Sequence, residues 1–278
     1  MPTFPVGIEA VAENQQQEAQ NMDLKDKIIV ITGAASGIGA AMARRFAQEG
    51  PKHIVCADRD LAGAEVVAAD VGGTAIKTDV SSGTDITALI ESVESDIGPI
   101  ELFVSNAGIA VEGGVEVSDD GWQNIWDINV NAHIRAARLL VPKMLARGGG
   151  YILSTASAAG LLAQIGSAPY SVTKHAAVSF AEWLAITHGA DGLKVSVLCP
   201  QGVDTAMTAG TDTSTVAKDG MLSAEKVADV TMEAISEERF LILPHPEVAD
   251  YMRQKGSDPE RWIGGMQKWQ ARLMEQSS

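Results

Sequence analysis

The sequence lacks the residues that mark a disulfide-rich, basic or membrane-embedded protein. It has two cysteines in 278 residues, which excludes a disulfide framework, and Cys56 and Cys199 each lie in an apolar run typical of buried free thiols. Lysine and arginine (21) are outnumbered by aspartate and glutamate (36), and this net charge of −15 disfavours nucleic acid and anionic lipid. No apolar run reaches the roughly 18 residues that cross a bilayer. We therefore expect no nucleic-acid partner and no membrane partner.

The N-terminal residues also lack the pattern of a signal peptide. Residues 1–22 are rich in Gln, Glu and Ala, and have no basic start followed by an apolar segment, so they do not resemble a signal peptide. We expect an N-terminal extension over 1–22 and a cytoplasmic protein. The remaining composition, with 46% hydrophobic and 21% charged residues in the whole chain, is that of a globular protein with ample core material.

Short apolar runs alternate with segments of helical spacing from residue 23 onward. Strands are predicted at 27–32, 53–57, 74–77, 100–104, 151–155, 193–198 and 239–243, and helices at 40–48, 86–97, 122–146, 170–187 and 224–236. The runs are apolar without alternation, which suits strands buried on both faces of a parallel sheet. The pattern predicts an α/β fold, a doubly wound parallel seven-stranded sheet of Rossmann type, in a single domain over 23–278.

Two segments stand outside this alternation. Residues 206–220, within a substrate loop over 206–222, have little periodicity, and we expect them to close over the reaction site. A C-terminal helix is predicted at 258–273, with Asp258 as its cap and Pro259 at its first position. Trp262 and Trp269 share one face of that helix, which packs on the chain itself, contacts a neighbouring subunit or covers the pocket.

The chemistry begins at a glycine-rich turn. Thr32 ends the first predicted strand, and Gly33-Ala34-Ala35-Ser36-Gly37-Ile38-Gly39 leads into the first helix. Glycines here allow a tight turn and a close approach of the backbone to a pyrophosphate at the helix N-terminus. The cofactor-binding residues expected from this turn are Gly33, Ser36, Gly37, Ile38 and Gly39.

An acidic residue ends the second strand. Asp58 lies 19 residues after Gly39, where a carboxylate accepts hydrogen bonds from a ribose and repels a 2′-phosphate, which favours NAD over NADP. Arg59 follows it, and a guanidinium is able to pair with that phosphate, so an NADP-dependent enzyme stays open. Ser36 offers no second positive charge to such a phosphate.

Several motifs together resemble the short-chain dehydrogenase/reductase family over about residues 24–243. They are Thr-Gly-x-x-x-Gly-x-Gly from Thr32, Asp79-Val80, Asn106-Ala107-Gly108, and Tyr170-x-x-x-Lys174 with Ser157 13 residues before the tyrosine. The resemblance implies a catalytic set of Asn129, Ser157, Tyr170 and Lys174. It also implies cofactor contacts from Asp79, Val80, Asn106, Ala107, Gly108, Tyr170, Lys174, Pro200, Val203 and Thr205. Ser105 stands where the family commonly has Asn, and Gln201 where it commonly has Gly.

The residue types agree with this resemblance. Tyr170 and Lys174 are four apart and therefore share a helix face. A phenol is a poor base at neutral pH, but a neighbouring ammonium and the oxidised nicotinamide both favour its phenolate. Tyr170 then exchanges a proton with the substrate, while Ser157 hydrogen-bonds the substrate oxygen. The resemblance further implies that Lys174 holds the nicotinamide ribose and that Asn129 positions a water.

The sequence leaves the substrate open. Ala158, Gln164, Ile165, Gln201 and Met207 are candidate pocket residues for a largely apolar alcohol or ketone, although Gln201 equally suits a hydrogen bond to loop backbone. The histidines and acids show no metal-ligand spacing, so no metal site is expected. An NAD-dependent alcohol dehydrogenase is the leading hypothesis, with an NADP-dependent carbonyl reductase as the alternative. A non-catalytic cofactor-binding protein is a further alternative, and the resemblance implies a homotetramer.

Overall fold

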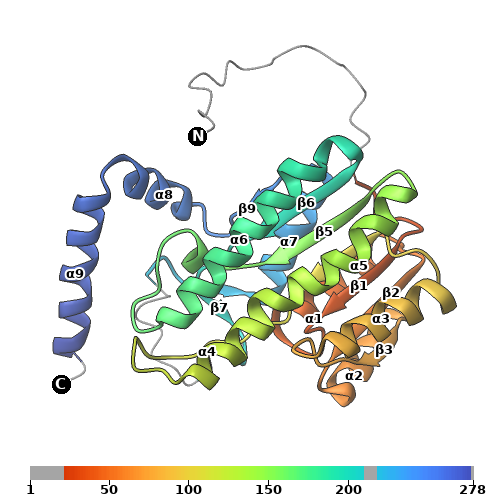
Figure 1. The fold of residues 1–278 in the computed structure, drawn as a ribbon, viewed down its shortest axis with the longest axis horizontal. Helices are drawn as coiled ribbons and strands as arrows, with labels where there is room; N and C mark the ends of the chain where they lie inside the picture. Colours follow the sequence, from red (N-terminus) through yellow and green to blue (C-terminus); the bar gives the residue numbers. More distant parts are fainter. Residues whose placement is uncertain (1–21, 210–217, 277–278) are drawn as a thin grey trace, which may run out of the picture.

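Seven parallel strands form one sheet in the order β3-β2-β1-β4-β5-β6-β9 (Figure 1). These strands are β1 (Ile28–Thr32), β2 (His53–Asp58), β3 (Thr74–Lys77), β4 (Leu102–Ser105), β5 (Gly150–Thr155), β6 (Leu193–Leu198) and β9 (Leu241–Ile242). The computed structural model describes residues 22–209 and 218–276. The chain order reverses between β1 and β4, which opens a crevice at the carboxyl ends of the strands, where doubly wound folds bind ligands. The predicted fold class is confirmed.

Helices cover both faces of this sheet because β1 buries side chains on both. Ile29 and Ile31 pack with helices α1 (Gly37–Ala47), α2 (Leu61–Val71) and α7 (Ala224–Ser236). Ile28 and Val30 point to the other face and pack with α3 (Gly83–Asp96), α5 (Ala132–Ala146) and α6 (Ala168–His188). Both predicted free thiols are buried, Cys56 in the first cluster and Cys199 in the second. Every side chain of β1 is buried, as the absence of alternation predicted.

The helical stretch predicted at 122–146 is interrupted. It consists of α4 (Asp119–Trp126), a π-helical turn η1 (Asp127–Asn131) and α5, which follow one another without a gap. A π turn inserts one extra residue and rotates the side chains that follow it. Asn129 lies in this turn, and its amide is held by both backbone groups of Ile109, at 2.9 Å each.

Some elements were not predicted. Helix α2 has a weakly amphipathic Ala- and Val-rich sequence, and it is capped by Asp60, which accepts from Gly63. The pair β7 (Val203–Asp204) and β8 (Leu222–Ser223) is too short for a periodic signal. Helix α8 (Glu247–Ser257) buries one residue, Val248, so its apolar pattern is sparse. The 3₁₀ turns η2 (Ala158–Gly160) and η3 (Gly189–Asp191) were also missed.

The C-terminal helix α9 (Pro259–Gln276) starts where it was predicted. The Asp258 carboxylate accepts from the backbone of Arg261, which confirms the cap, and the helix runs three residues beyond the predicted end. Figure 1 shows α8 and α9 projecting to one side of the sheet and its helices. Nearly all of the predicted extension over 1–22, and residues 210–217 of the predicted substrate loop, lie outside the described residues.

Candidate active site

The glycine turn folds as a cradle at the start of α1. Gly33 (φ +67°) and Gly37 (φ +53°) adopt left-handed backbone conformations that disfavour other residues. A Cβ at Gly39 would lie 2.1 Å from the Gly33 carbonyl oxygen, so only glycine lets the helix start pack on the turn. Gly33, Ser36, Gly37 and Ile38 line the cavity, whereas Gly39 lies behind them. This cradle and the N-terminus of α1 fit a pyrophosphate.

Asp58, the last residue of β2, and Asp79, which follows β3, lie at one end of the same cavity. Asp58 Oδ2 accepts from Ala35 N at 3.0 Å and Oδ1 accepts from Asp60 N at 2.9 Å, which fixes the carboxylate against the glycine turn. Asp79 accepts from the backbone and hydroxyl of Ser81. Asp58, Arg59, Asp79 and Val80 all line the cavity, as expected for contacts to a ribose and an adenine.

Asn106 joins three strands at their carboxyl ends. Its Nδ2 donates to Thr32 O (3.0 Å) and Gly33 O (3.3 Å), and its Oδ1 accepts from Thr155 Oγ1 at 3.1 Å. Its amide is thus occupied by the protein, which places it as a support for the glycine turn. Ala107 and Gly108, the other two residues of that motif, line the cavity beside it.

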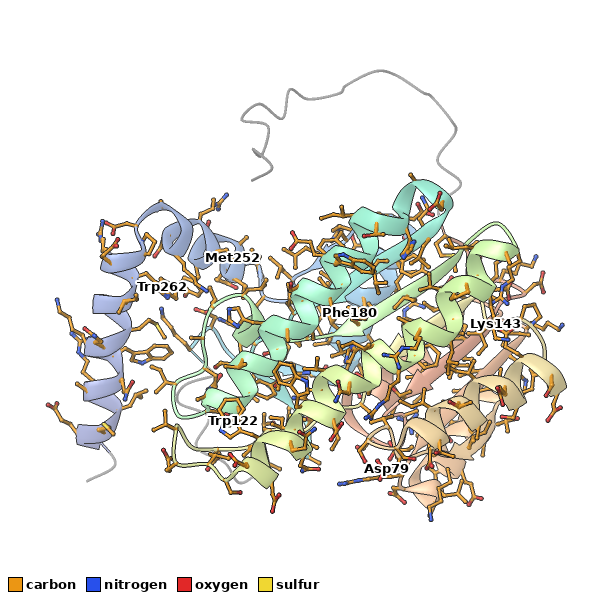
Figure 2. All side chains as sticks on the ribbon, in the orientation of Figure 1. Asp79, Trp122, Lys143, Phe180, Met252 and Trp262 are labelled. Carbon is orange, nitrogen blue, oxygen red and sulfur yellow. The ribbon has the colours of Figure 1, made fainter. Side chains whose placement is uncertain are left out.

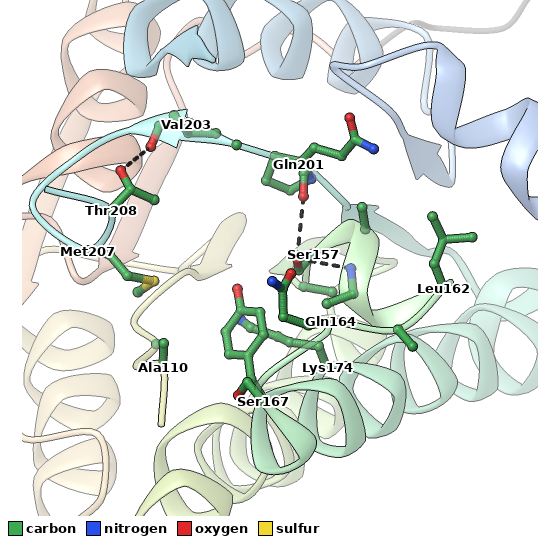
Figure 3. A pocket seen from close by; sticks show the side chains of 18 of the residues that line it. Ala110, Ser157, Leu162, Gln164, Ser167, Lys174, Gln201, Val203, Met207 and Thr208 are labelled. Carbon is green, nitrogen blue, oxygen red and sulfur yellow. Dashed lines mark hydrogen bonds between the residues drawn. The ribbon is translucent and has the colours of Figure 1, made fainter. Parts of the chain in front are cut away.

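The three predicted reacting side chains meet at the other end. Lys174 is buried, and its Nζ donates to Thr155 O at 3.0 Å and lies 5.5 Å from the centre of the Tyr170 ring. Ser157 Oγ accepts from Ala159 N (3.1 Å) and donates to Pro200 O (3.4 Å). Figure 3 shows Ser157 and Lys174 directed into one pocket. The structure therefore brings together the hydroxyl of Ser157, between β5 and η2, and the phenol and ammonium of α6.

Burial sets the protonation of this group. Burial raises the pKa of Tyr170 above its ordinary value, and a hydrogen bond with Ser157 lowers this pKa by less than burial raises it. Burial also lowers the pKa of Lys174 to about 8. The thiol of Cys199 has its pKa raised to about 12 by burial, so it stays neutral beside them. Without a cofactor, the phenol is therefore protonated at neutral pH.

Asn129 lies one layer behind the cavity. Besides its bonds to Ile109, its Nδ2 donates to Thr173 Oγ1 at 3.3 Å. Asn129 Oδ1 and Lys174 Nζ flank Gly108, since a Cβ on that glycine would lie 3.3 Å from each. The π turn thus brings the Asn129 amide close to Lys174 without placing it in the cavity lining. Its position fits a residue that acts through Lys174.

A cavity of about 1370 Å³ connects these groups. The other sequence-predicted residues that line it are Pro200, Val203, Thr205, Ala158, Gln164, Ile165, Gln201 and Met207. Thr205 lies against the glycine turn, since a Cβ at Gly37 would lie 3.3 Å from its Cγ2. The Gln201 backbone donates to His245 Nδ1 at 3.2 Å, while its side-chain Oε1 is buried and has no partner among the described residues.

Sequence reasoning missed several lining residues. Ile109, Ala110 and Glu112 follow the Asn-Ala-Gly motif, and their position after a strand end was the available signal. Helix α8 contributes Tyr251 and Gln254, and the spacing of Val248, Tyr251 and Met252 is the one weak signal that its sequence offers. Within 22–209 and 218–276, no group of three or more possible metal ligands gathers. In the same residues, no helix is long and apolar enough to cross a membrane.

The family described as short chain dehydrogenase matches residues 27–215. The chain belongs to the short-chain dehydrogenase family. This confirms the resemblance seen in the motifs, and makes the protein an oxidoreductase.

Three relatives are similar to this chain over nearly the whole of their own length. A 1-deoxy-11-beta-hydroxypentalenate dehydrogenase of Streptomyces exfoliatus is 33% identical, over 87% of this chain and 91% of that protein. A short-chain dehydrogenase/reductase of Burkholderia phymatum, solved with NAD, is 31% identical over 86% and 96%, with a TM-score of 0.78. L-Sorbose reductase of Gluconobacter frateurii, solved with NADPH and L-sorbose, is 30% identical over 80% and 97%, with a TM-score of 0.70.

Proposed function

We propose that this protein interconverts a secondary alcohol and a ketone with a nicotinamide cofactor, and that it prefers NAD. One observation carries the proposal: Ser157, Tyr170 and Lys174 face a single cavity whose other end is the glycine cradle of α1. The cradle fits a dinucleotide, which supplies the hydride acceptor or donor when bound. Relatives named for a hydroxypentalenate and for L-sorbose support a substrate that carries a hydroxy or keto group.

In this proposal the chain's own residues handle the proton. Tyr170 removes the hydroxyl proton of the alcohol, or returns it to the carbonyl oxygen in the reverse direction. Ser157 donates a hydrogen bond to that oxygen and stabilises the charge that develops on it. Lys174, protonated below about pH 8, favours the phenolate of Tyr170 and holds the nicotinamide ribose. Asn129 positions the water that links Lys174 to solvent.

A substrate screen tests the proposal. The protein is incubated with a panel of secondary alcohols and the matching ketones, with each nicotinamide cofactor separately, and absorbance is followed at 340 nm. We expect turnover of at least one alcohol–ketone pair. Cofactor binding without any turnover would support the alternative of a non-catalytic cofactor-binding protein.

Asp58 gives a prediction about the cofactor. The unmodified protein has the higher kcat/KM with NAD, and Asp58→Ala shifts the NAD/NADP ratio by about tenfold toward NADP, because the carboxylate no longer repels the 2′-phosphate. Asp60→Ala is the matched control, because Asp60 caps α2 and does not line the cavity. Equal or higher kcat/KM with NADP in the unmodified protein would show that Arg59 dominates and that the alternative of an NADP-dependent reductase holds.

The pKa of Tyr170 gives a prediction about pH. Because burial raises this pKa, the phenol is protonated at neutral pH and available as an acid, but not as a base. We expect kcat/KM for alcohol oxidation to rise from pH 7 to pH 9, and kcat/KM for ketone reduction to fall as pH rises through the pKa. Cofactor Kd measured at each pH separates proton transfer from binding. Oxidation that slows between pH 7 and pH 9 contradicts this assignment.

The subunit arrangement is a further prediction. Trp183 and Ile186 on α6 are 55% and 77% exposed, more than expected for large apolar side chains of a monomer. We propose that this helix pairs with a second copy across a two-fold axis within a homotetramer. Light scattering at micromolar concentration should give about four times the chain mass of 29.2 kDa. A mass near that of one chain would contradict it.

A further inference from the structure

The cavity extends beyond the reacting side chains onto helix α9. This helix contributes two adjacent stripes to the lining, one of Trp262, Met266 and Trp269 and one of Arg261, Gly265, Lys268 and Arg272. Spacings of three and four residues keep each stripe on one side of the helix. Figure 2 shows Trp262 on the side of α9 that faces the rest of the chain. Trp262, Met266 and Trp269 are half-buried.

Helices α8 and α9 form an arm, and contacts with other parts of the chain hold this arm beside the cavity. Lys255 of α8 donates to Leu161 O (2.8 Å) and Leu162 O (3.0 Å), in the loop that follows η2. Tyr251 donates to Asp219 Oδ1 at 3.0 Å. Lys218 Nζ lies 4.6 Å from the Tyr251 ring centre and 5.8 Å from that of Trp269. The face of α9 is therefore positioned by residues from three other parts of the chain.

The basic stripe has no internal counter-charge. Arg261, Lys268 and Arg272 are exposed and have no carboxylate within 4 Å among the described residues. Arg59 and Arg138 are also unpaired, whereas the other six described arginines each pair with a carboxylate. Asp258, which caps α9, accepts from the Arg261 backbone, and neither Glu260 nor Glu275 of α9 forms an ion pair with these three cations. Three unpaired cations on one cavity wall are notable in a chain of net charge −15. Such a wall attracts an anion.

We propose that α9 forms a substrate subsite for a large, mainly apolar molecule that carries an anionic group. The indoles and Met266 contact its apolar body, and Lys268 and Arg272 pair with its anionic end, while its hydroxyl or keto carbon lies at Tyr170. The cavity of about 1370 Å³ exceeds the roughly 300–1000 Å³ of ordinary ligand sites, which leaves room for a dinucleotide and such a substrate together. The assignment of Tyr170 as the reacting end rests on the function proposed above.

Two dyes with the same rings test the subsite without turnover. Binding of anionic 8-anilinonaphthalene-1-sulfonate and neutral N-phenyl-1-naphthylamine is measured by dye fluorescence, at saturating NAD so that the cofactor site is filled. Lys268→Gln/Arg272→Gln should weaken the anionic dye about tenfold and the neutral dye less than twofold. Arg253→Gln is the matched control, because this exposed α8 residue does not line the cavity.

The outcomes separate this proposal from the proposed function. A selective loss of threefold or more for the anionic dye, absent in Arg253→Gln, supports the subsite. A smaller loss, or an equal loss in the control, overturns it even if the enzyme oxidises alcohols. Displacement of the anionic dye by dodecanoate but not by dodecanol supports the charge requirement, and equal displacement by both overturns it. Absence of turnover with every alcohol contradicts the proposed function and leaves the dye result standing.

Discussion

Tyr170→Phe is expected to lower kcat about a thousandfold while changing the Kd for the cofactor less than threefold. In the proposed mechanism the substitution removes the hydroxyl that exchanges a proton with the substrate oxygen, and general acid–base catalysis contributes roughly 10²–10⁴-fold. Ser157 keeps its hydrogen bond to Pro200 O, and the glycine cradle is untouched, so binding survives. Stopped-flow kinetics and cofactor fluorescence titration measure the two quantities separately.

Tyr151→Phe is the matched control for this variant. The Tyr151 hydroxyl is buried and contacts Ser196 Oγ at 2.6 Å, away from the cavity. Its loss should cost about 1 kcal/mol of stability, since one buried hydrogen bond is removed while Ser196 keeps its donation to Arg239 O, and should leave kcat unchanged. Tyr170→Phe activity within tenfold of the unmodified protein would show that another group transfers the proton.

The sequence predicted the part of the site that depends on motifs of fixed spacing. The glycine turn, Asp58 and the Tyr170/Lys174 pair were placed correctly on one cavity because parallel strands bring their carboxyl ends to one edge. Strand β6 and helix α7 were predicted with their observed bounds. The roles of these residues in catalysis and cofactor binding stay predictions.

Features that depend on side-chain contacts could not be predicted in this way. The π turn around Asn129 is stabilised by Ile109, 20 residues earlier, and no local periodicity encodes that contact. The resemblance implied a cofactor contact for Asn106, which lines the cavity, but it did not indicate that the Asn106 amide also donates to the carbonyls of Thr32 and Gly33. The arm of α8 and α9 is held by Lys255 of α8, which donates to a loop more than 90 residues earlier in the sequence. Such long-range contacts decide the outer shape of the cavity.

Gly39→Ala is expected to raise the Kd for the cofactor at least a hundredfold. The new Cβ would lie 2.1 Å from Gly33 O and 2.6 Å from Asn106 Nδ2, both too close for any side chain. The turn has to open, and the hydrogen bonds from Asn106 that hold it would be lost. Because the backbone groups that we propose hold the pyrophosphate belong to this turn, we expect binding to fail even where the sheet stays folded.

Gly256→Ala separates this effect from the general cost of replacing a helical glycine. Gly256 lies in α8 with no atom within 4 Å of its hypothetical Cβ, so the substitution should leave cofactor Kd and melting temperature nearly unchanged. Isothermal titration gives the Kd, and a circular-dichroism melt shows whether Gly39→Ala remains folded. If the folded Gly39→Ala protein binds cofactor within threefold of the unmodified affinity, the cradle at the start of α1 does not hold the pyrophosphate. The dinucleotide would then have to lie elsewhere in the cavity, and the assignment of Asp58 to its ribose would fail with it.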